Sequence, residues 1–147
     1  MSDHNRTLAS SFADPDDIAG FRRCKAKKSH RTKGGKLVIH TDKYCFAFGD
    51  NGVGCWGDDT TAPEPMCALP PDDMIARWGS IDAARHKTIL VTANKRTVIC
   101  KLADRMPWRR FIRNGCGIDL NPEACKRLGL TPPIKLPALW SWMEEKA

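Results

Sequence analysis

The sequence predicts a mainly β protein built as a small barrel, and three observations support this prediction. Two strand-like runs, TILVTA at 88–93 and TVICKLA at 97–103, flank a tight turn at 94–96. Glycine-rich and proline-broken segments at 49–59 and 60–73 exclude long regular elements there. A short strand at 117–120 leads directly into one brief helix. Many short strands with tight loops are typical of small closed barrels.

The N-terminal part is expected to lie outside the barrel. Residues 1–13 look loose, and a helix is expected from Asp14, as the N-cap, through Pro15 at the first helical position to about Lys28. The KSHRTKGG segment that follows is basic and flexible. We therefore expect an N-terminal extension at 1–42, with a short helix and a basic segment, and a barrel domain at 43–147.

Further elements are expected along the barrel domain and just before it. LVIH at 37–40 and CFAF at 45–48 are strand-like, and DDMIARWG at 72–79 predicts a short helix. The segment PPIKLPALWSWM at 132–143 predicts a last strand. Three of its side chains are expected to anchor the core: Leu139, Trp140 and Trp142.

The stretch NGCGIDLNPEACKRLGL at 114–130 places a carboxylate between apolar neighbours. Asn121 is expected to be the N-cap of the following helix and Pro122 its first residue, while Gly129 ends it. Asp119 precedes this helix start. Such a carboxylate is either a structural anchor held by hydrogen-bond donors near the helix start or a group kept for chemistry, and both readings remain open.

Charge points to an anionic partner. The chain of 147 residues has a net charge of +7, and eight of its 24 lysines and arginines lie between 22 and 36. A second basic group comprises Arg105, Arg109, Arg110 and Arg113. Nucleic acid, a membrane surface or an acidic wall polymer would suit such patches, and so would a solvated face without a partner. Nucleic acid is the least favoured partner, because the basic run lacks interleaved aromatic residues.

The cysteines and histidines do not predict a metal centre. Seven cysteines occur without any Cys-x-x-Cys pair, and the four histidines are scattered. We expect thiols that are mostly reduced and buried, no disulfide framework, no metal site and no cofactor. The chain has no apolar run long enough to span a membrane and no signal-peptide core in its first twenty residues, so synthesis in the cytoplasm without export is expected.

Two acidic motifs carry a resemblance to a known family. The hairpin at 88–103 leads into ADRMP at 103–107, and a loop then leads to IDLNP at 118–122, followed by Ala124, Leu128 and Gly129. This pattern resembles the six-stranded double-psi β-barrel of the RlpA-like, barwin and expansin group, with Met106 in place of the family's glycine. The resemblance spans about 43–143 and leaves 1–42 uncovered.

The resemblance implies action on polysaccharides. RlpA-like members are lytic transglycosylases of peptidoglycan, related barrels are cellulases, and expansin-like members bind and loosen walls without hydrolysis. It implies that Asp119 is the catalytic acid and that Asp104, nearby in the groove, is the second catalytic candidate. Further candidates for substrate binding are Trp56 and Trp108 for stacking on sugars, together with His86 and Arg105.

Two classes of function follow as expectations. The first is a wall-active enzyme, a peptidoglycan lytic transglycosylase or glycoside hydrolase that uses Asp119 as general acid and base. The second is a non-catalytic bacteriophage virion or tail component that uses the barrel for assembly or wall binding. A bacteriophage origin would explain a wall-directed protein without an export signal, acting at the wall or in the virion. Partners are then peptidoglycan, another anionic wall polysaccharide, or other virion proteins.

Overall fold

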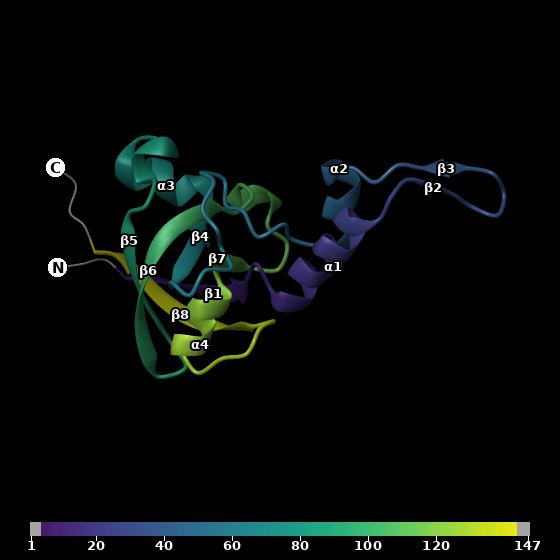
Figure 1. Ribbon diagram of the computed structural model, residues 1–147. Helices are drawn as coiled ribbons and strands as arrows, with labels where there is room; N and C mark the ends of the chain where they lie inside the picture. Colours follow the sequence, from purple (N-terminus) through teal and green to yellow (C-terminus); the bar gives the residue numbers. More distant parts are fainter. Residues whose placement is uncertain (1–3, 144–147) are drawn as a thin grey trace.

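The computed structural model describes residues 4–143 and contains a closed barrel of six strands (Figure 1). Around the barrel the strand order is β1-β7-β4-β6-β5-β8. This confirms the predicted mainly β fold with a small six-stranded barrel, while the finer assignment to the double-psi group stays a prediction. The barrel strands are β1 (Asn5–Ser11), β4 (Met66–Leu69), β5 (Thr88–Ala93), β6 (Arg96–Arg105), β7 (Cys116–Leu120) and β8 (Lys135–Trp142).

Strand pairing around the barrel is mixed. β1 pairs with β7 and β4 pairs with β6 in parallel, whereas all other neighbours are antiparallel. Each parallel pair has a register shift, between Leu8 and Ala9 in the first and between Cys67 and Ala68 in the second. The core lies inside the ring, where alternate side chains of β5 and β7 are buried. Trp140 is buried there and Trp142 packs against the core, as predicted, whereas Leu139 is only partly buried and is not among the core residues.

β1 belongs to the barrel, which differs from the predicted boundary at residue 42. Its residues pair with β7 on one side and with β8 on the other, so β1 closes the ring. The segment NRTLASS has one β-branched residue, Thr7, and no aromatic residue, so its composition gives little local signal for a strand. Only its two distant partners make it a strand.

The β5–β6 hairpin and the helix after β7 confirm two local predictions. Ala93 pairs with Arg96, and both turn residues, Asn94 and Lys95, have the positive φ angles that a two-residue hairpin turn favours. Asn121 caps α4 (Pro122–Arg127) by accepting a hydrogen bond from the Ala124 amide.

Further short helices lie beside the barrel. The helix predicted at 72–79 is present as α3 (Pro71–Trp78). Two 3₁₀ turns, η2 (Asp82–Ala84) and η3 (Arg109–Phe111), interrupt the loops. Among the described residues, no helix is long and apolar enough to cross a membrane.

Between β1 and β4 the chain forms an arm that projects from the barrel (Figure 1). The arm contains α1 (Pro15–Ala26), β2 (His30–Arg31), β3 (Leu37–Val38), α2 (Asp42–Cys45) and η1 (Phe46–Phe48). The helix predicted from Pro15 is confirmed and ends at Ala26, and the strand-like run at 37–40 includes β3. The segment at 45–48, predicted to be strand-like, is instead helical, because Thr41 caps a helical turn by accepting from the Tyr44 amide.

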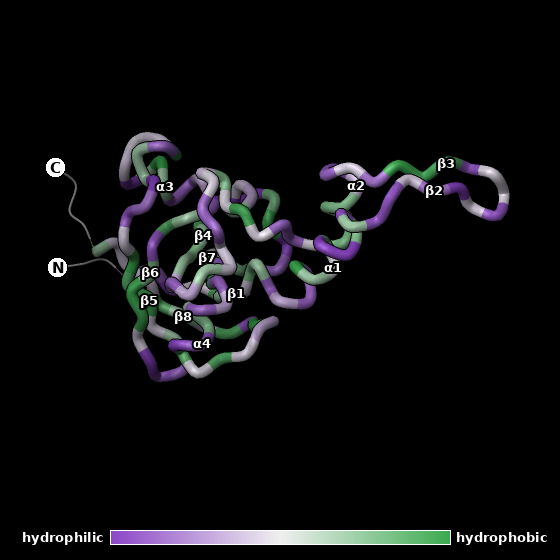
Figure 2. Tube along the Cα trace, viewed as in Figure 1, coloured by the Kyte–Doolittle hydropathy of each residue, from purple (hydrophilic) through white to green (hydrophobic). Residues whose placement is uncertain are grey.

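The arm is polar over most of its length (Figure 2) and is cross-linked by a disulfide between Cys24 and Cys45. This bond corrects the expectation that disulfides are disfavoured. The other five cysteines are free, and four of them are buried in the barrel, as expected for structural thiols. Cys55 is the exposed one.

Candidate functional site

A pocket of about 430 Å³ opens beside Asp119 at one end of the barrel. Its volume falls in the range of small-molecule sites. It lies where β1 and β7 meet the loop between β6 and β7. Its lining residues are Ser10, Ser11, Met106, Pro107, Phe111, Ile112, Arg113, Asn114 and Asp119.

Strand alternation directs the Asp119 side chain away from the core. The neighbouring side chains of Ile118 and Leu120 are fully buried inside the barrel, so Asp119 faces outward between them. Ser10 lies opposite Asp119 in the parallel β1–β7 pair, and its hydroxyl donates a hydrogen bond to Asp119 Oδ1. The carboxyl group is therefore oriented by a neighbouring strand.

The pKa of Asp119 is raised to about 6. Loss of hydration on burial is the largest cause, and the negative charges of Asp104, Asp14 and Asp50 raise the pKa further. The hydrogen bond from Ser10 opposes this by favouring the ionised form. A carboxyl group that titrates near pH 6 can both donate and accept a proton close to neutrality, which is the property required of a general acid.

Asp104 is fixed by backbone donors. Its Oδ1 accepts hydrogen bonds from the Cys55 amide at 2.9 Å and from the Arg105 amide at 2.8 Å. Burial raises the pKa of Asp104, while these two amides lower it. The Cys55 contact ties the glycine-rich loop at 52–57 to β6, where Gly54 leaves no room for a side chain against the Ala103 carbonyl.

Asp104 and Asp119 lie on the two strands that flank β4, and both are opposite Ala68 in register. Because neighbouring strands are about 4.8 Å apart, their Cα atoms are about 10 Å apart. At this separation the negative charge of Asp104 raises the pKa of Asp119. The structure brings together the two carboxylates that the sequence singled out.

The loop that forms the pocket wall is pinned to α3. The Arg109 amide donates to Asp72 Oδ1 at 2.8 Å, and the Arg109 guanidinium bonds Asp73 Oδ1 at 2.7 Å. Met106 is buried beneath the loop, whereas Phe111 and Arg113 are exposed at the pocket. The wall therefore offers an apolar ring and a cation beside the Asp119 carboxyl.

The other predicted binding residues lie elsewhere. Trp56 donates from Nε1 to Asp82 at 3.3 Å, and its ring meets the His86 ring edge-on. His86 in turn contacts Asp58 at 2.7 Å, and Asp58 pairs with Lys101 at 3.1 Å. The structure thus places Trp56 and His86 in a separate polar cluster at the α3–β5 side. The Cys55 amide, one residue before Trp56, connects this loop to Asp104.

Trp108 and Arg105 flank the pocket segment. Arg105 ends β6 and is exposed, and the Trp108 carbonyl accepts a hydrogen bond from the Phe111 amide. Within the part of the chain that the structure describes, none of the four predicted binding residues is among those lining the Asp119 pocket.

Sequence reasoning did not identify Ser10, Ser11, Phe111 or Asn114 as parts of the site. The two serines come from a strand that local composition does not reveal, and they reach Asp119 only through the β1–β7 pairing. Among the described residues, three potential metal ligands also come together on the arm, namely Cys24, His40 and Cys45. His40 and Cys45 are five positions apart, but Cys24 lies 16 positions before His40 and no Cys-x-x-Cys pair marks the group, so the sequence alone did not reveal it.

Comparisons with known proteins do not assign the chain to a family. No family model matches it, and no curated protein matches its sequence. Among solved structures it is similar to Streptomyces papain inhibitor, with 15% sequence identity and a TM-score of 0.49, over 97% of this chain and 96% of that chain. This degree of similarity assigns no function. The fold and the pocket define the chain as a small closed-barrel protein with a protonatable carboxyl group in a surface pocket.

Proposed function

We propose that the protein cleaves the glycan strands of peptidoglycan as a lytic transglycosylase, with Asp119 as its general acid and then its general base. The observation that carries this proposal is the Asp119 carboxyl, which lies in a pocket, is oriented by Ser10 and has a pKa of about 6. An ordinary aspartate would be almost fully ionised at neutral pH and would be a poor proton donor.

The chemistry needs one such group. The protonated carboxyl donates its proton to the glycosidic oxygen as that bond breaks. The resulting carboxylate then accepts the proton of the sugar's own 6-hydroxyl group, whose oxygen attacks the anomeric carbon and closes a 1,6-anhydro ring. No water is activated, so no second catalytic carboxylate is required.

The environment of Asp104 favours this single-acid mechanism over hydrolysis with inversion. An inverting hydrolase needs a second carboxylate as base, roughly 6.5–9.5 Å from the acid. Asp104 is engaged by two backbone amides through one oxygen and anchors a loop. Its proposed role is to keep the Asp119 pKa high through its negative charge.

The pocket wall supplies recognition groups suited to this polymer. Phe111 presents an exposed ring for stacking against a sugar face, and Arg113 presents a cation for the carboxylates of the peptide stems. Trp56 and Trp108 lie outside the pocket and would contact more distant parts of a long glycan strand.

The exposed arm favours a second candidate, a non-catalytic bacteriophage virion or tail component that binds the wall or assembles with other virion proteins. All eight lysines and arginines between 22 and 36 are exposed on the projecting arm. A basic arm beside a barrel is suited to an anionic polymer or an acidic protein surface. In that case Asp119 would serve only to join β7 to β1 through Ser10.

Digestion of purified sacculi distinguishes the candidates. Wild type, Asp119→Asn and the control Asp16→Asn, which changes an exposed carboxylate on α1, are incubated with sacculi and the soluble products are analysed by mass spectrometry. The proposal requires 1,6-anhydro products from wild type and the control but not from Asp119→Asn. Reducing-end products would indicate hydrolysis instead. Binding to sacculi without release by folded wild type would reject the enzyme and favour the second candidate.

A further inference from the structure

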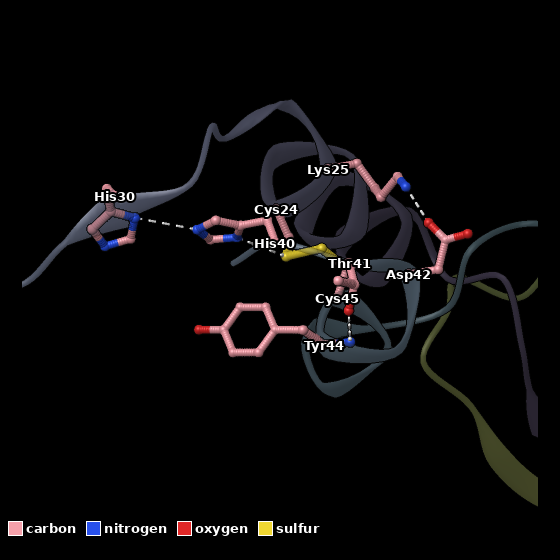
Figure 3. Close-up of a disulfide and its surroundings, with 8 residues drawn as sticks. All are labelled: Cys24, Lys25, His30, His40, Thr41, Asp42, Tyr44 and Cys45. Carbon is pink, nitrogen blue, oxygen red and sulfur yellow. Dashed lines mark hydrogen bonds and ion pairs between the residues drawn. A yellow bond between two sulfur atoms is a disulfide. The ribbon is translucent and has the colours of Figure 1, made fainter. Parts of the chain in front are cut away.

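The disulfide of the arm and a neighbouring histidine together offer three potential metal ligands. Cys24 from α1, His40 from the segment after β3 and Cys45 from α2 converge (Figure 3), and one ligand atom from each lies within 4.8 Å of the other two. Both sulfurs are buried and His40 is half-buried. A disulfide needs only the two cysteines, so the imidazole beside them has no part in that bond.

The position of His40 matches the geometry of zinc coordination. Its Nδ1 atom lies 3.7 Å from Cys24 Sγ. In tetrahedral zinc sites, bonds of about 2.3 Å to sulfur and about 2.0–2.1 Å to nitrogen place these two atoms about 3.6 Å apart. The two sulfurs, now bonded, would have to separate to about 3.8 Å to bind one ion. Rotation of the two cysteine side chains, one on α1 and one on α2, can produce this separation.

The second ring nitrogen of His40 also has a partner. His40 Nε2 lies 3.4 Å from His30 Nδ1, and the two rings stack with their centroids 5.4 Å apart (Figure 3). Tyr44 contacts His40 with its ring edge-on at 5.2 Å. Metal-binding histidines are commonly oriented in this way through the nitrogen that does not bind the metal. Two of the chain's four histidines, His30 and His40, therefore lie beside the disulfide.

The arm needs a cross-link because it has almost no core. Across residues 14–50, all of which the structure describes, the buried residues are Ile18, Cys24 and Cys45. A segment of this size without a hydrophobic core requires a disulfide or a metal ion to hold a single fold. In a reducing compartment the disulfide is lost, and then only a metal can supply that link.

We propose that Cys24, Cys45 and His40 form a zinc site in the reduced protein, with an open fourth position for water, and that the disulfide is its oxidised, metal-free state. Two low-molecular-weight thiols reduce the disulfide and are themselves oxidised to a disulfide. The two protein thiols then bind Zn²⁺ as thiolates and release two protons. In reverse, hydrogen peroxide takes two electrons from the thiolates, consumes two protons and yields two waters, so the disulfide forms and Zn²⁺ leaves. This proposal departs from the absence of a metal site expected from the sequence.

Metal titration of the full chain tests this site. The protein is reduced with a phosphine, which does not compete for zinc as a dithiol does, and is titrated anaerobically with Co²⁺ and then with Zn²⁺. We expect one equivalent of Co²⁺ to bind with the sulfur-to-cobalt absorption and intense visible bands of a tetrahedral site, and Zn²⁺ to displace it. Addition of hydrogen peroxide should release one Zn²⁺ as one disulfide forms, measured by a colorimetric chelator and by mass spectrometry.

Variants assign the ligands. Cys24→Ser and Cys45→Ser should each weaken cobalt binding and reduce the sulfur-to-cobalt absorption by at least half, because one of the two thiolates is lost, whereas Cys55→Ser, which removes the exposed free thiol, should leave it unchanged. His30→Ala should weaken zinc binding by about 10- to 100-fold, as loss of an orienting partner does. His40→Ala should weaken it more and shift the visible bands.

A separate control shows whether the arm folds in the variants. His40→Ala retains both sulfurs, so disulfide formation in its oxidised form shows whether the arm folds without the imidazole. The proposal is overturned if reduced wild type shows no cobalt–sulfur absorption. It is equally overturned if Cys24→Ser binds zinc as tightly as wild type, or if oxidisable His40→Ala binds zinc unchanged.

Discussion

At the scale of single residues, the burial of Asp119 makes the stability of the barrel depend on pH. Its pKa of about 6 in the fold lies above the value of about 3.9 for an unfolded aspartate. The folded chain therefore binds this proton more tightly than the unfolded chain. Stability falls as the pH rises between these two values and stays lower above the folded pKa, by up to about 3 kcal/mol.

Asp119→Asn should remove that cost, because the amide stays neutral and its oxygen still accepts from Ser10. We expect the variant to be more stable than wild type by about 1–3 kcal/mol at pH 7.5 and equal to it at pH 3.5, measured by urea unfolding. Asp16→Asn is the control and should differ from wild type by less than about 0.5 kcal/mol at both pH values. A destabilised Asp119→Asn at pH 7.5 would mean that the ionised carboxylate holds the fold together.

Asn121 is a second residue on which much depends. It is fully buried, its Oδ1 accepts from the Met66 and Ala124 amides, and its Nδ2 donates to the carbonyls of Thr60 and Glu64. It therefore joins α4 to β4 and to the loop before β4. The sequence alone predicts the N-cap. It does not predict the hydrogen bonds to Thr60, Glu64 and Met66, because these residues precede Asn121 by more than fifty positions.

Asn121→Ala should lower the free energy of unfolding by about 3 kcal/mol or more, since three buried hydrogen bonds and one partly buried hydrogen bond are lost. Thermal or urea unfolding measures this. The control is Thr41→Ala, an exposed N-cap on α2 that accepts one amide, for which a loss of about 1 kcal/mol or less is expected. Equal losses for the two variants would contradict a special role for Asn121.

At the scale of elements, the glycine-rich loop is held against β6 by a close backbone approach. A methyl group on Gly54 would overlap the Ala103 carbonyl oxygen. Gly54→Ala must therefore push the loop outward and weaken the bond from the Cys55 amide to Asp104. We expect a loss of about 1–3 kcal/mol and, in amide hydrogen exchange, lower protection of Cys55.

Gly34→Ala serves as the matched control for this change. Its added methyl group would meet only the Thr32 hydroxyl at 4.0 Å, so a negligible change in stability is expected. If Gly54→Ala is as stable as Gly34→Ala, the loop is not fixed as described.

The disulfide should stabilise the arm without stabilising the barrel. It joins residues 21 apart in sequence, and closing such a loop is worth about 3 kcal/mol. In metal-free protein, Cys24→Ser/Cys45→Ser should therefore expose the many basic residues of the arm to trypsin. The barrel should keep its unfolding midpoint, read from tryptophan fluorescence. Simultaneous loss of both would show that arm and barrel unfold together.

The elements also show where sequence reasoning succeeds. The β5–β6 hairpin and α4 were predicted because their turn and cap residues act locally on a few neighbouring peptides. β1 was missed because its register depends on strands more than a hundred residues away. The segment at 46–48 was misassigned because a helical cap at Thr41 outweighs the strand preference of its phenylalanines. Asp119 and Asp104 were found through their motifs, whereas Ser10 had no local signal.

At the scale of the whole molecule, charge is distributed unevenly. The net charge is +7, and the arm carries a run of eight exposed cations. We expect binding to sacculi to weaken steeply as ionic strength rises, because exposed charges are screened within about 8 Å at physiological salt. Co-sedimentation with sacculi at low and high salt measures this.

Charge reversal locates the binding surface. Lys27→Glu/Lys28→Glu/Lys33→Glu on the arm is compared with Lys95→Glu/Lys126→Glu/Lys135→Glu on the barrel, where all six lysines are exposed. Both triple variants lower the net charge by the same amount. Only the arm variant should lose binding at low salt. Equal losses would show that overall charge, rather than the arm, attracts the polymer.

The place of β1 between β7 and β8 has a consequence for synthesis. Asn5 meets Trp140 across 135 positions in the sequence, so the ring cannot close until β8 has left the ribosome. At roughly 5–20 residues per second, β1 waits on the order of ten seconds for its partners. During that interval the β5–β6 hairpin can form, but β1 remains an unpaired strand that needs protection from other nascent chains.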